Sequence, residues 1–420
     1  MPAAATGAAS PDDSPTGRAP TGGTPAGDVV PDATLVARFT DALPAMLADI
    51  ETLIRCESPS SDLAALARSA DLVAELGTRL LGESPERLAA DGRAHLRWRL
   101  GADSAATRVL LLAHHDTVWP VGSLQTHPCD VRDGVLRGPG CFDMKTGIVM
   151  ALYAAAELAG ALPLTVLVTS DEELGSPSSR QLIEQEARSA RAALVLESSA
   201  DGGALKTGRK GTSIYRLAVR GRAAHAGLEP AAGINAAVEL AHQVLAISRL
   251  GDQELGTTVT PTVLAAGTTT NTVPAYASVA VDVRARTGVE QARVDAAIRA
   301  LRPTTPGASL DVQGGPNRPP LEEAASEDLF GRAAAIGARL GLRPLAGAAV
   351  GGASDGNLTA GVGTPTLDGL GAVGGGAHAD HEHVVVAEIP GRTALLAALI
   401  GDLCREEEAR AAEDGGAPQV

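Results

Sequence analysis

The stretch RVLLLAHHD, Arg108–Asp116, indicates the fold class, because five consecutive apolar residues are followed directly by three ionisable ones. A short apolar run of this kind predicts a strand that is buried on both faces. Two later segments have the same form, LTVLVTSDEE (Leu164–Glu173) and AALVLES (Ala192–Ser198). Near-continuous apolar strands are typical of parallel sheets with helices on both faces, so the sequence predicts an α/β domain with a mostly parallel central sheet.

Helical segments alternate with these strands, as a parallel sheet requires. Good helix formers at helical spacing predict helices over Thr34–Arg55, Met144–Ala159, Ser178–Arg188 and Glu322–Leu340.

The pattern changes at about residue 209, where shorter alternating strands begin. The strands and helices expected in this part are Ile214–Gly221, Asn235–Ser248, Thr257–Gly267, Val273–Ala285, Val289–Arg302 and Ala308–Gly314. Their order, β-α-β-β-α-β, is that of a ferredoxin-like domain. We therefore expect a disordered leader (1–30), a split catalytic domain (31–208 and 319–406), an inserted domain (209–318) and a disordered tail (407–420).

Composition excludes several classes of function. The 420 residues carry 35 Lys and Arg against 50 Asp and Glu, and this net charge of −15 argues against nucleic-acid binding. Aromatic residues make up only 2%, so a stacking platform for bases or sugars is not expected. No apolar run is long enough to span a membrane, the N-terminal segment lacks the features of a signal peptide, and the four cysteines form no CxxC pair. These features predict a cytoplasmic enzyme with no nucleic-acid or membrane partner.

Ionisable residues gather where the predicted strands end. His114 and Asp116 follow the first strand, Glu172 and Glu173 the second, and Glu197 the third. In open parallel sheets, ligands bind at the carboxyl ends of the strands. Carboxylates packed together repel one another, and a divalent cation removes that repulsion. Carboxylate and imidazole ligands suit Zn²⁺, with Mn²⁺ or Co²⁺ as substitutes.

Each of these motifs alone has a simpler explanation. Asp143, after the glycine-rich Gly138–Gly140, can be a helix N-cap. Glu197 can pair with a lysine, and the Glu172–Glu173 pair can be a solvated strand end. The sequence HADHEH (His378–His383) can be an adventitious metal-binding loop. The evidence for a metal site is their joint occurrence at one predicted sheet edge.

At these residues the sequence resembles the M20 family of co-catalytic metallopeptidases, in its glutamate carboxypeptidase and acetylornithine deacetylase branch. The resemblance covers residues 35–405. The motifs that carry it are AHHDTV (Ala113–Val118), GPGCFDMKTG (Gly138–Gly147), SDEELGS (Ser170–Ser176), VLES (Val195–Ser198), AAHAG (Ala223–Gly227), NTVPAYA (Asn271–Ala277), NRPP (Asn317–Pro320), GGASDG (Gly351–Gly356) and GGGAHADHEHV (Gly374–Val384). It implies a zinc-peptidase-like catalytic domain and an inserted lid and dimerisation domain.

The resemblance also implies a metal site with two Zn²⁺ per subunit. Asp143 would bridge the two ions, Glu173 and His378 would hold the first, and His114 and Glu197 would hold the second. The peptide bond after Asp143 would be cis, as is common in the family.

Three further residues have implied catalytic roles. Glu172 would be the general base, and His225 the lid histidine that reaches the site of a partner subunit in a homodimer. Asp116 lies two residues after His114, so we expect its carboxylate to accept the other N–H of that imidazole and orient it.

Substrate recognition is expected to be polar, because rings are scarce. Arg284, Arg318 and Asn271 are candidates for contacts with a substrate carboxylate, together with the backbone N–H groups of the loop around Gly352. Both arginines can instead be surface or interdomain ion pairs.

The activity that this site predicts is hydrolysis of an amide bond, with release of an amino acid such as glutamate that has a free carboxylate. The substrate would be a small peptide or an N-acyl amino acid. A deacylase or dipeptidase of the same family is the alternative within the class. A catalytically silent dimeric binding homologue is the alternative from another class.

Overall fold

The computed structural model describes residues 32–101, 108–158 and 162–414. The expected leader therefore lies outside the described residues. In place of the expected tail, the last helix continues to Asp414, and residues 415–420 are not described.

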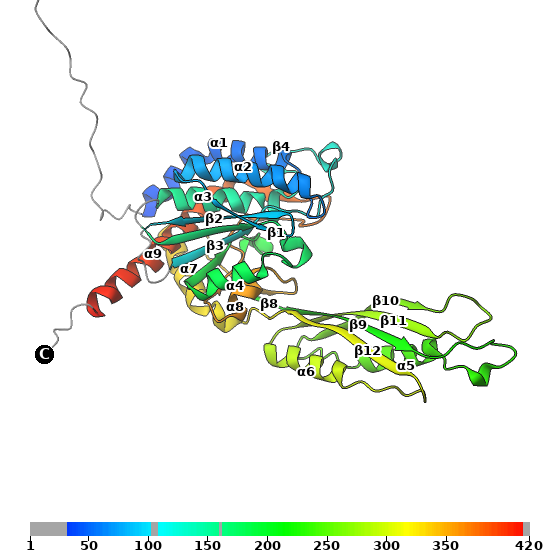
Figure 1. Ribbon diagram of the computed structural model, residues 1–420. Coiled ribbons are helices and arrows are strands. Elements are labelled where there is room, and N and C mark those ends of the chain that lie inside the picture. The colour runs from blue at the N-terminus through cyan, green and yellow to red at the C-terminus, as the bar shows by residue number, and fades with distance from the viewer. Residues whose placement is uncertain (1–31, 102–107, 159–161, 415–420) are drawn as a thin grey trace, which may run out of the picture. The chain divides into compact units, whose positions relative to one another are not determined.

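A six-stranded sheet is the centre of the catalytic part (Figure 1). Its strands, in spatial order, are β1 (Glu86–Ala90), β2 (Arg93–Leu100), β6 (Leu164–Thr169), β3 (Arg108–His114), β7 (Ala190–Val195) and β14 (Thr366–Leu367). The pairs β3–β6, β3–β7 and β7–β14 are parallel, whereas β1–β2 and β2–β6 are antiparallel. The mostly parallel sheet is thus confirmed, and β14 adds a strand from beyond the inserted domain.

Helices cover both faces of this sheet, as the apolar strands predicted. Successive strand residues point to opposite faces, so Leu111 packs toward one layer while Leu110 and Leu112 pack toward the other. The first layer contains α1 (Asp32–Arg55), α2 (Leu63–Leu81), α3 (Thr146–Glu157), α7 (Glu327–Arg339) and α9 (Ile389–Asp414). The second contains α4 (Arg180–Arg188) and α8 (Gly356–Gly361).

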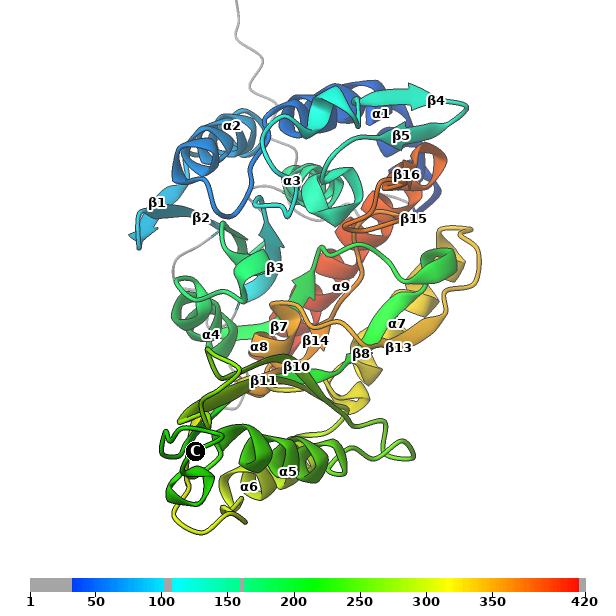
Figure 2. The same ribbon diagram turned by 90° about the vertical axis from the view of Figure 1, so that its right-hand side faces the viewer.

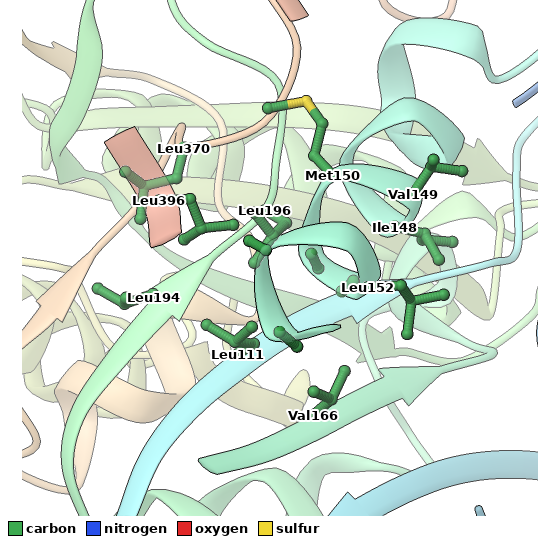
Figure 3. Close-up of a cluster of buried hydrophobic side chains, with 14 of the residues drawn as sticks. Leu111, Ile148, Val149, Met150, Leu152, Val166, Leu194, Leu196, Leu370 and Leu396 are labelled. Carbon is green, nitrogen blue, oxygen red and sulfur yellow. The ribbon is translucent and has the colours of Figure 1, made fainter. Parts of the chain in front are cut away.

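The larger core lies between the sheet and the first layer. Figure 3 shows side chains of α3, among them Ile148 and Leu152, beside Leu111 of β3 and Val166 of β6. These four residues are at most 1% exposed, and burial of each such side chain contributes about 1.5–3 kcal/mol. The core fixes the strand ends from which the functional residues project.

The inserted part is a four-stranded antiparallel sheet with two helices (Figure 2). Its elements are β9 (Gly211–Arg220), α5 (Ala236–Ser248), β10 (Thr258–Ala266), β11 (Tyr276–Ala285), α6 (Gly288–Arg299) and β12 (Ser309–Arg318). The spatial order is β10-β11-β9-β12, and the two helices share one hydrophobic core with β9 and β11. This is the predicted β-α-β-β-α-β arrangement, and β12 runs four residues beyond the expected strand.

Two smaller sets of strands complete the fold. One sheet has the order β15-β16-β5-β4, formed by β4 (Asp130–Arg132), β5 (Val135–Arg137), β15 (Gly374–Gly375) and β16 (His383–Val385). The other is the parallel pair of β8 (Leu205–Arg209) and β13 (Gly347–Val350). Within the ranges that the structure describes, the helices are all too short or too polar to span a bilayer.

The start of α3 differs from the prediction. Asp143 and Met144 have non-helical backbone angles, so the helix begins at Thr146 instead of Met144. The peptide bond between Asp143 and Met144 is cis, as expected. Asp143 therefore belongs to the loop before the helix and is not its N-cap.

Candidate metal centre

The expected metal ligands come from five segments that meet at one edge of the central sheet. His114 is the last residue of β3, Glu173 follows β6, and Glu197 follows β7. Because these strands are parallel, their carboxyl ends lie side by side. Asp143 comes from the loop before α3, and His378 from the loop between β15 and β16.

Asp143 lies between the two histidines. Its Oδ1 is 3.4 Å from Nε2 of His114, and its Oδ2 is 3.3 Å from Nε2 of His378. Glu197 Oε1 lies 3.4 Å from Nε2 of His114, and Glu173 Oε1 lies 3.1 Å from Nε2 of His378. The structure thus brings all five predicted ligands together, in two groups that share Asp143.

The donor atoms of this cluster fit a divalent cation. Nε2 of His114 and Oδ1 of Asp143 are buried, and within the described part of the chain neither has a hydrogen-bond partner. Nδ1 of His114 lies 2.9 Å from the carbonyl oxygen of Asp116, so a proton on Nδ1 leaves the lone pair of Nε2 facing carboxylates. Lone pairs that face one another repel, and a cation at that place turns each of them into a ligand.

Hydrogen bonds to Asp143 and Glu173 raise the pKa of His378 to about 10. Without a metal ion, protons therefore supply the positive charge that these acids require. Metal binding displaces such protons, because an imidazole ligand must be neutral.

The Asp116 carboxylate lies beside the His114 imidazole, as expected, but it is not the shortest contact of that ring. The imidazole Nδ1 is closest to the backbone carbonyl of Asp116, while the carboxylate Oδ1 is 3.4 Å away. The carboxylate also accepts hydrogen bonds from the backbone N–H groups of Glu172 and Glu173, both at 3.2 Å, and from Ser60 Oγ at 2.7 Å. These backbone donors follow β6, the strand beside β3, so their positions depend on the pairing of the two strands. Asp116 thereby orients the segment that carries the expected base and a metal ligand.

Glu172 is buried and lies beside the same cluster. Atoms of Glu172, Glu197 and His114 all lie within 4.8 Å of one another. Burial raises the pKa of Glu172 well above its ordinary value, although the charge of Arg318 opposes this effect. A raised pKa makes a carboxylate a stronger base, as abstraction of a proton from water requires.

Comparison with known proteins supports this interpretation of the site. The model of "Peptidase family M20/M25/M40" matches residues 110–402. Carboxypeptidase G2 from Pseudomonas sp. (strain RS-16) is 31% identical over 396 residues, which are 89% of this chain and 92% of that protein. The chain belongs to the M20 peptidase family. It is a metal-dependent hydrolase that acts on C–N bonds.

Two further relatives show the range of this family. Succinyl-diaminopimelate desuccinylase from Burkholderia ambifaria is 35% identical over 164 residues, which are 34% of this chain and 43% of that protein. A Bacillus subtilis protein described as a dinuclear metal-binding M20 peptidase has a TM-score of 0.59 at 14% identity, over 88% of this chain and 99% of that one. Its likeness shows that the fold is shared.

In this M20 enzyme, the predicted substrate contact Arg318 is engaged by protein groups. Its guanidinium forms a 2.7 Å ion pair with Glu172 Oε1, a 2.9 Å ion pair with Asp355 Oδ1 and a 2.6 Å hydrogen bond to Ser176 Oγ. Arg318 is only 5% exposed and ends β12, the last strand of the lid sheet. This arrangement corresponds to the alternative of an interdomain ion pair.

Of the other predicted lid residues in this M20 enzyme, His225 and Asn271 are exposed, and Arg284 is half-buried on β11. Nδ1 of His225 accepts hydrogen bonds from the backbone N–H groups of Gly227 and Leu228, and the carbonyl of Asn271 accepts one from Ala226. Arg284 forms an ion pair with Asp282 at 2.9 Å. Among the described residues, no hydrogen bond or ion pair joins His225, Asn271 or Arg284 to a metal ligand.

Sequence reasoning missed a second buried cation beside the site. Arg209 donates to both carboxylate oxygens of Asp368, at 2.7 and 3.2 Å, and its NH2 lies 3.6 Å from Glu197 Oε2. Nη1 of Arg209 also donates to the carbonyl of Gly352. This contact holds the loop whose backbone N–H groups were expected to contact a substrate carboxylate. The sequence GRKG (Gly208–Gly211) gives no spacing signal for this role, since Asp368 is 159 residues away.

Proposed function

We propose that the protein is a dinuclear zinc hydrolase that releases an amino acid with a free carboxylate, such as glutamate, from a small peptide or an N-acyl amino acid. The observation that carries this proposal is the position of Asp143, whose two carboxylate oxygens face two different histidines. A carboxylate in this position can serve two cations at once. Zn²⁺ is preferred because imidazole and carboxylate ligands suit it, and Co²⁺ or Mn²⁺ can substitute.

A bound pair of zinc ions would polarise the amide carbonyl and lower the pKa of a bound water toward about 7. Glu172 then takes a proton from the attacking water and passes it to the leaving nitrogen. Arg318 holds Oε1 of Glu172 at 2.7 Å, and Asp116 holds the backbone N–H of the same residue. We propose that these two contacts keep the base in one orientation through the reaction.

Recognition of a substrate carboxylate is proposed for the cationic group beside the hinge. A cavity of about 570 Å³ is lined there by Lys210 and Arg286, and also by Glu322 and Glu323. Partial burial and the charges of Arg286 and Arg284 lower the pKa of Lys210, so the charges of both arginines reach this side chain. Such a group attracts a carboxylate, and guanidinium geometry allows two parallel hydrogen bonds to it. Asn271 and the loop at Gly352 remain proposed contacts.

We also propose that the enzyme is a homodimer in which His225 acts on the partner's site. Because Nδ1 of His225 accepts two backbone N–H groups, the proton of the neutral ring is on Nε2. The exposed ring therefore offers one N–H donor, as stabilisation of a developing oxyanion requires.

A second candidate function is deacylation of an N-acyl amino acid. The similarity to succinyl-diaminopimelate desuccinylase favours it, whereas the similarity to carboxypeptidase G2 favours release of a C-terminal residue. The cationic group accommodates both, because each reaction leaves a free carboxylate on the released amino acid.

The test is a screen of zinc-loaded protein with dipeptides, N-acyl amino acids and matched amides that lack the free carboxylate, scored by released amino acid. We expect turnover of the carboxylate substrates and little turnover of the matched amides. Arg284→Ala should raise KM for the carboxylate substrates about tenfold or more, with Arg249→Ala as the surface control. Equal turnover of both series, or an unchanged KM, would refute the recognition model. Zinc binding without hydrolysis of any substrate would favour the silent homologue.

A further inference from the structure

Glu382 is a buried carboxylate that sequence analysis left without a role. It lies four residues after His378 in the loop that joins β15 and β16, and its exposed fraction is 4%. Two internal hydrogen bonds of 2.9 Å order this loop, one from Ala379 N to Gly376 O and one from Glu382 N to Ala379 O. Glu382 is not among the five residues that the resemblance assigns to the metals.

Four N–H donors surround the Glu382 carboxylate. Oε1 accepts from the backbone N–H of Phe142 at 2.8 Å and of Asp143 at 3.0 Å. Oε2 accepts from the backbone N–H of Gly140 at 3.0 Å and from the indole N–H of Trp119 at 2.6 Å. A carboxylate has about four acceptor positions, so these donors use its full capacity.

Strand pairing explains how these two loops meet. β5 ends at Arg137, immediately before the loop that carries Asp143, and β16 begins at His383, immediately after Glu382. Arg137 and His383 are direct partners in the antiparallel register. The residues beyond this last pair therefore lie opposite one another, which brings Glu382 to the backbone of Gly140–Asp143.

The same loop thus contacts Asp143 in two ways. His378 faces the side-chain Oδ2 at 3.3 Å, and Glu382 binds the main-chain N–H at 3.0 Å. We propose that Glu382 is a positioning residue of the metal site, which fixes the backbone of the bridging Asp143 to the loop that carries His378. It acts through these two ligands and does not touch a metal ion. The inference rests on the proposed metal site and deepens it.

The test compares Glu382→Gln with a matched buried carboxylate in the lid. Glu239 is fully buried and accepts from Gln243 Nε2, from Thr304 Oγ1 and from the backbone N–H groups of Thr304 and Thr305. Glutamine offers an N–H₂ group where the carboxylate had an oxygen, so both Glu→Gln changes leave buried donors unpaired. Only Glu382→Gln disturbs the metal ligands.

Zinc affinity of the metal-stripped full-length variants is measured by competition with a chromophoric chelator, and folding is followed by circular dichroism. We expect Glu382→Gln to bind zinc about tenfold or more weakly, and Glu239→Gln to bind it within about twofold of the wild type. With excess zinc, Glu382→Gln should recover much of its kcat at an unchanged KM.

Unchanged zinc affinity in Glu382→Gln, or an equal loss in Glu239→Gln, would overturn the proposal. Should Glu382→Gln not fold, Trp119→Phe removes one donor and keeps the carboxylate, and zinc affinity equal to that of the wild type would then overturn it. A wild-type protein that binds no zinc would instead refute the proposed function, so the two failures are distinguishable.

Discussion

Two sets of buried or half-buried acids lie side by side in this enzyme, and they differ in what balances their charge. Glu172 and Asp355 are paired with Arg318, and Asp368 is paired with Arg209, at distances of 2.7–2.9 Å. In the other set, Asp143, Glu173 and Glu197 face Nε2 atoms of histidines at 3.1–3.4 Å, and Glu197 also lies 3.6 Å from the guanidinium of Arg209. The first set is held by the fixed charges of arginines, whereas the second has partners that must give up a proton to bind a cation. Burial of acids alone therefore does not indicate a metal site. Acids that face histidines indicate one more strongly than acids paired with arginines.

The largest expected effect concerns Glu172, which lies at the border of the two sets. Glu172→Gln should lower kcat about 10²–10⁴-fold without loss of bound zinc, because the proposed base is lost and the five proposed ligands remain. Activity and zinc stoichiometry are measured on the same preparation. Glu173→Gln is the contrast, since it should lose metal as well as rate. A near-normal rate in Glu172→Gln would refute the base assignment, and loss of metal would place Glu172 among the ligands.

The next prediction tests the arginine-paired set. Arg318→Ala leaves Glu172 and Asp355 buried without their cation, and removal of one partner from a buried ion pair costs about 3–5 kcal/mol. We expect this loss in urea unfolding both with and without zinc. Arg55→Ala, which removes an exposed partner of Glu51, should leave stability almost unchanged. A loss below about 1 kcal/mol for Arg318→Ala would show that this set does not need its cation.

The smallest predicted effect tests the histidine-paired set. Adding zinc to metal-stripped protein should raise Tm progressively, by the equivalent of about 2.7 kcal/mol at 100 times Kd, because only the folded chain has the site. The high pKa of His378, about 10, means that protons compete with zinc. The stabilisation by zinc should therefore weaken as pH falls from 8 to 6. Asp143→Asn should abolish the shift in Tm, and a shift that persists in this variant would locate zinc binding elsewhere.

The sequence predicted the architecture where periodicity is strong. The apolar runs ending at His114 and Glu197 indicated buried parallel strands, and the alternating segments of the insert indicated an antiparallel sheet. Helix α2 and the hairpin β1–β2 were not predicted, although Asp62 is an ordinary N-cap that accepts from Ala64 N and Ala65 N. The N-cap at Asp62 could therefore have predicted the start of α2. Helix α9 was also missed, because Pro390 and Gly391 at its start resemble a turn.

The sequence predicted the cluster of proposed metal ligands, but it did not predict the residues that support this cluster. Ligands have a restricted chemistry and sit at strand ends, so motifs locate them. The hydrogen-bond partners of the Arg318, Arg209 and Glu382 side chains are separated from them by 37 to 263 residues and depend on how the loops pack. Composition and spacing carry no signal for such pairs. The same limit applies to Asp116, whose carboxylate lies beside the predicted imidazole but also binds the backbone after β6, which was not predicted.

The two ends of the inserted lid are neighbours in space. Thr212, near the start of β9, is paired with Arg318 at the end of β12, and just outside them Arg209 and Leu321 exchange backbone hydrogen bonds at 2.9 and 3.0 Å. The lid therefore leaves and re-enters the catalytic part at adjacent points, as a short surface loop would. Lengthening a connection whose ends are held together has a small entropic cost, since each doubling of loop length costs only about 0.6 kcal/mol. The lid is therefore free to change in length and surface while the sheet that holds the metal ligands keeps its connectivity.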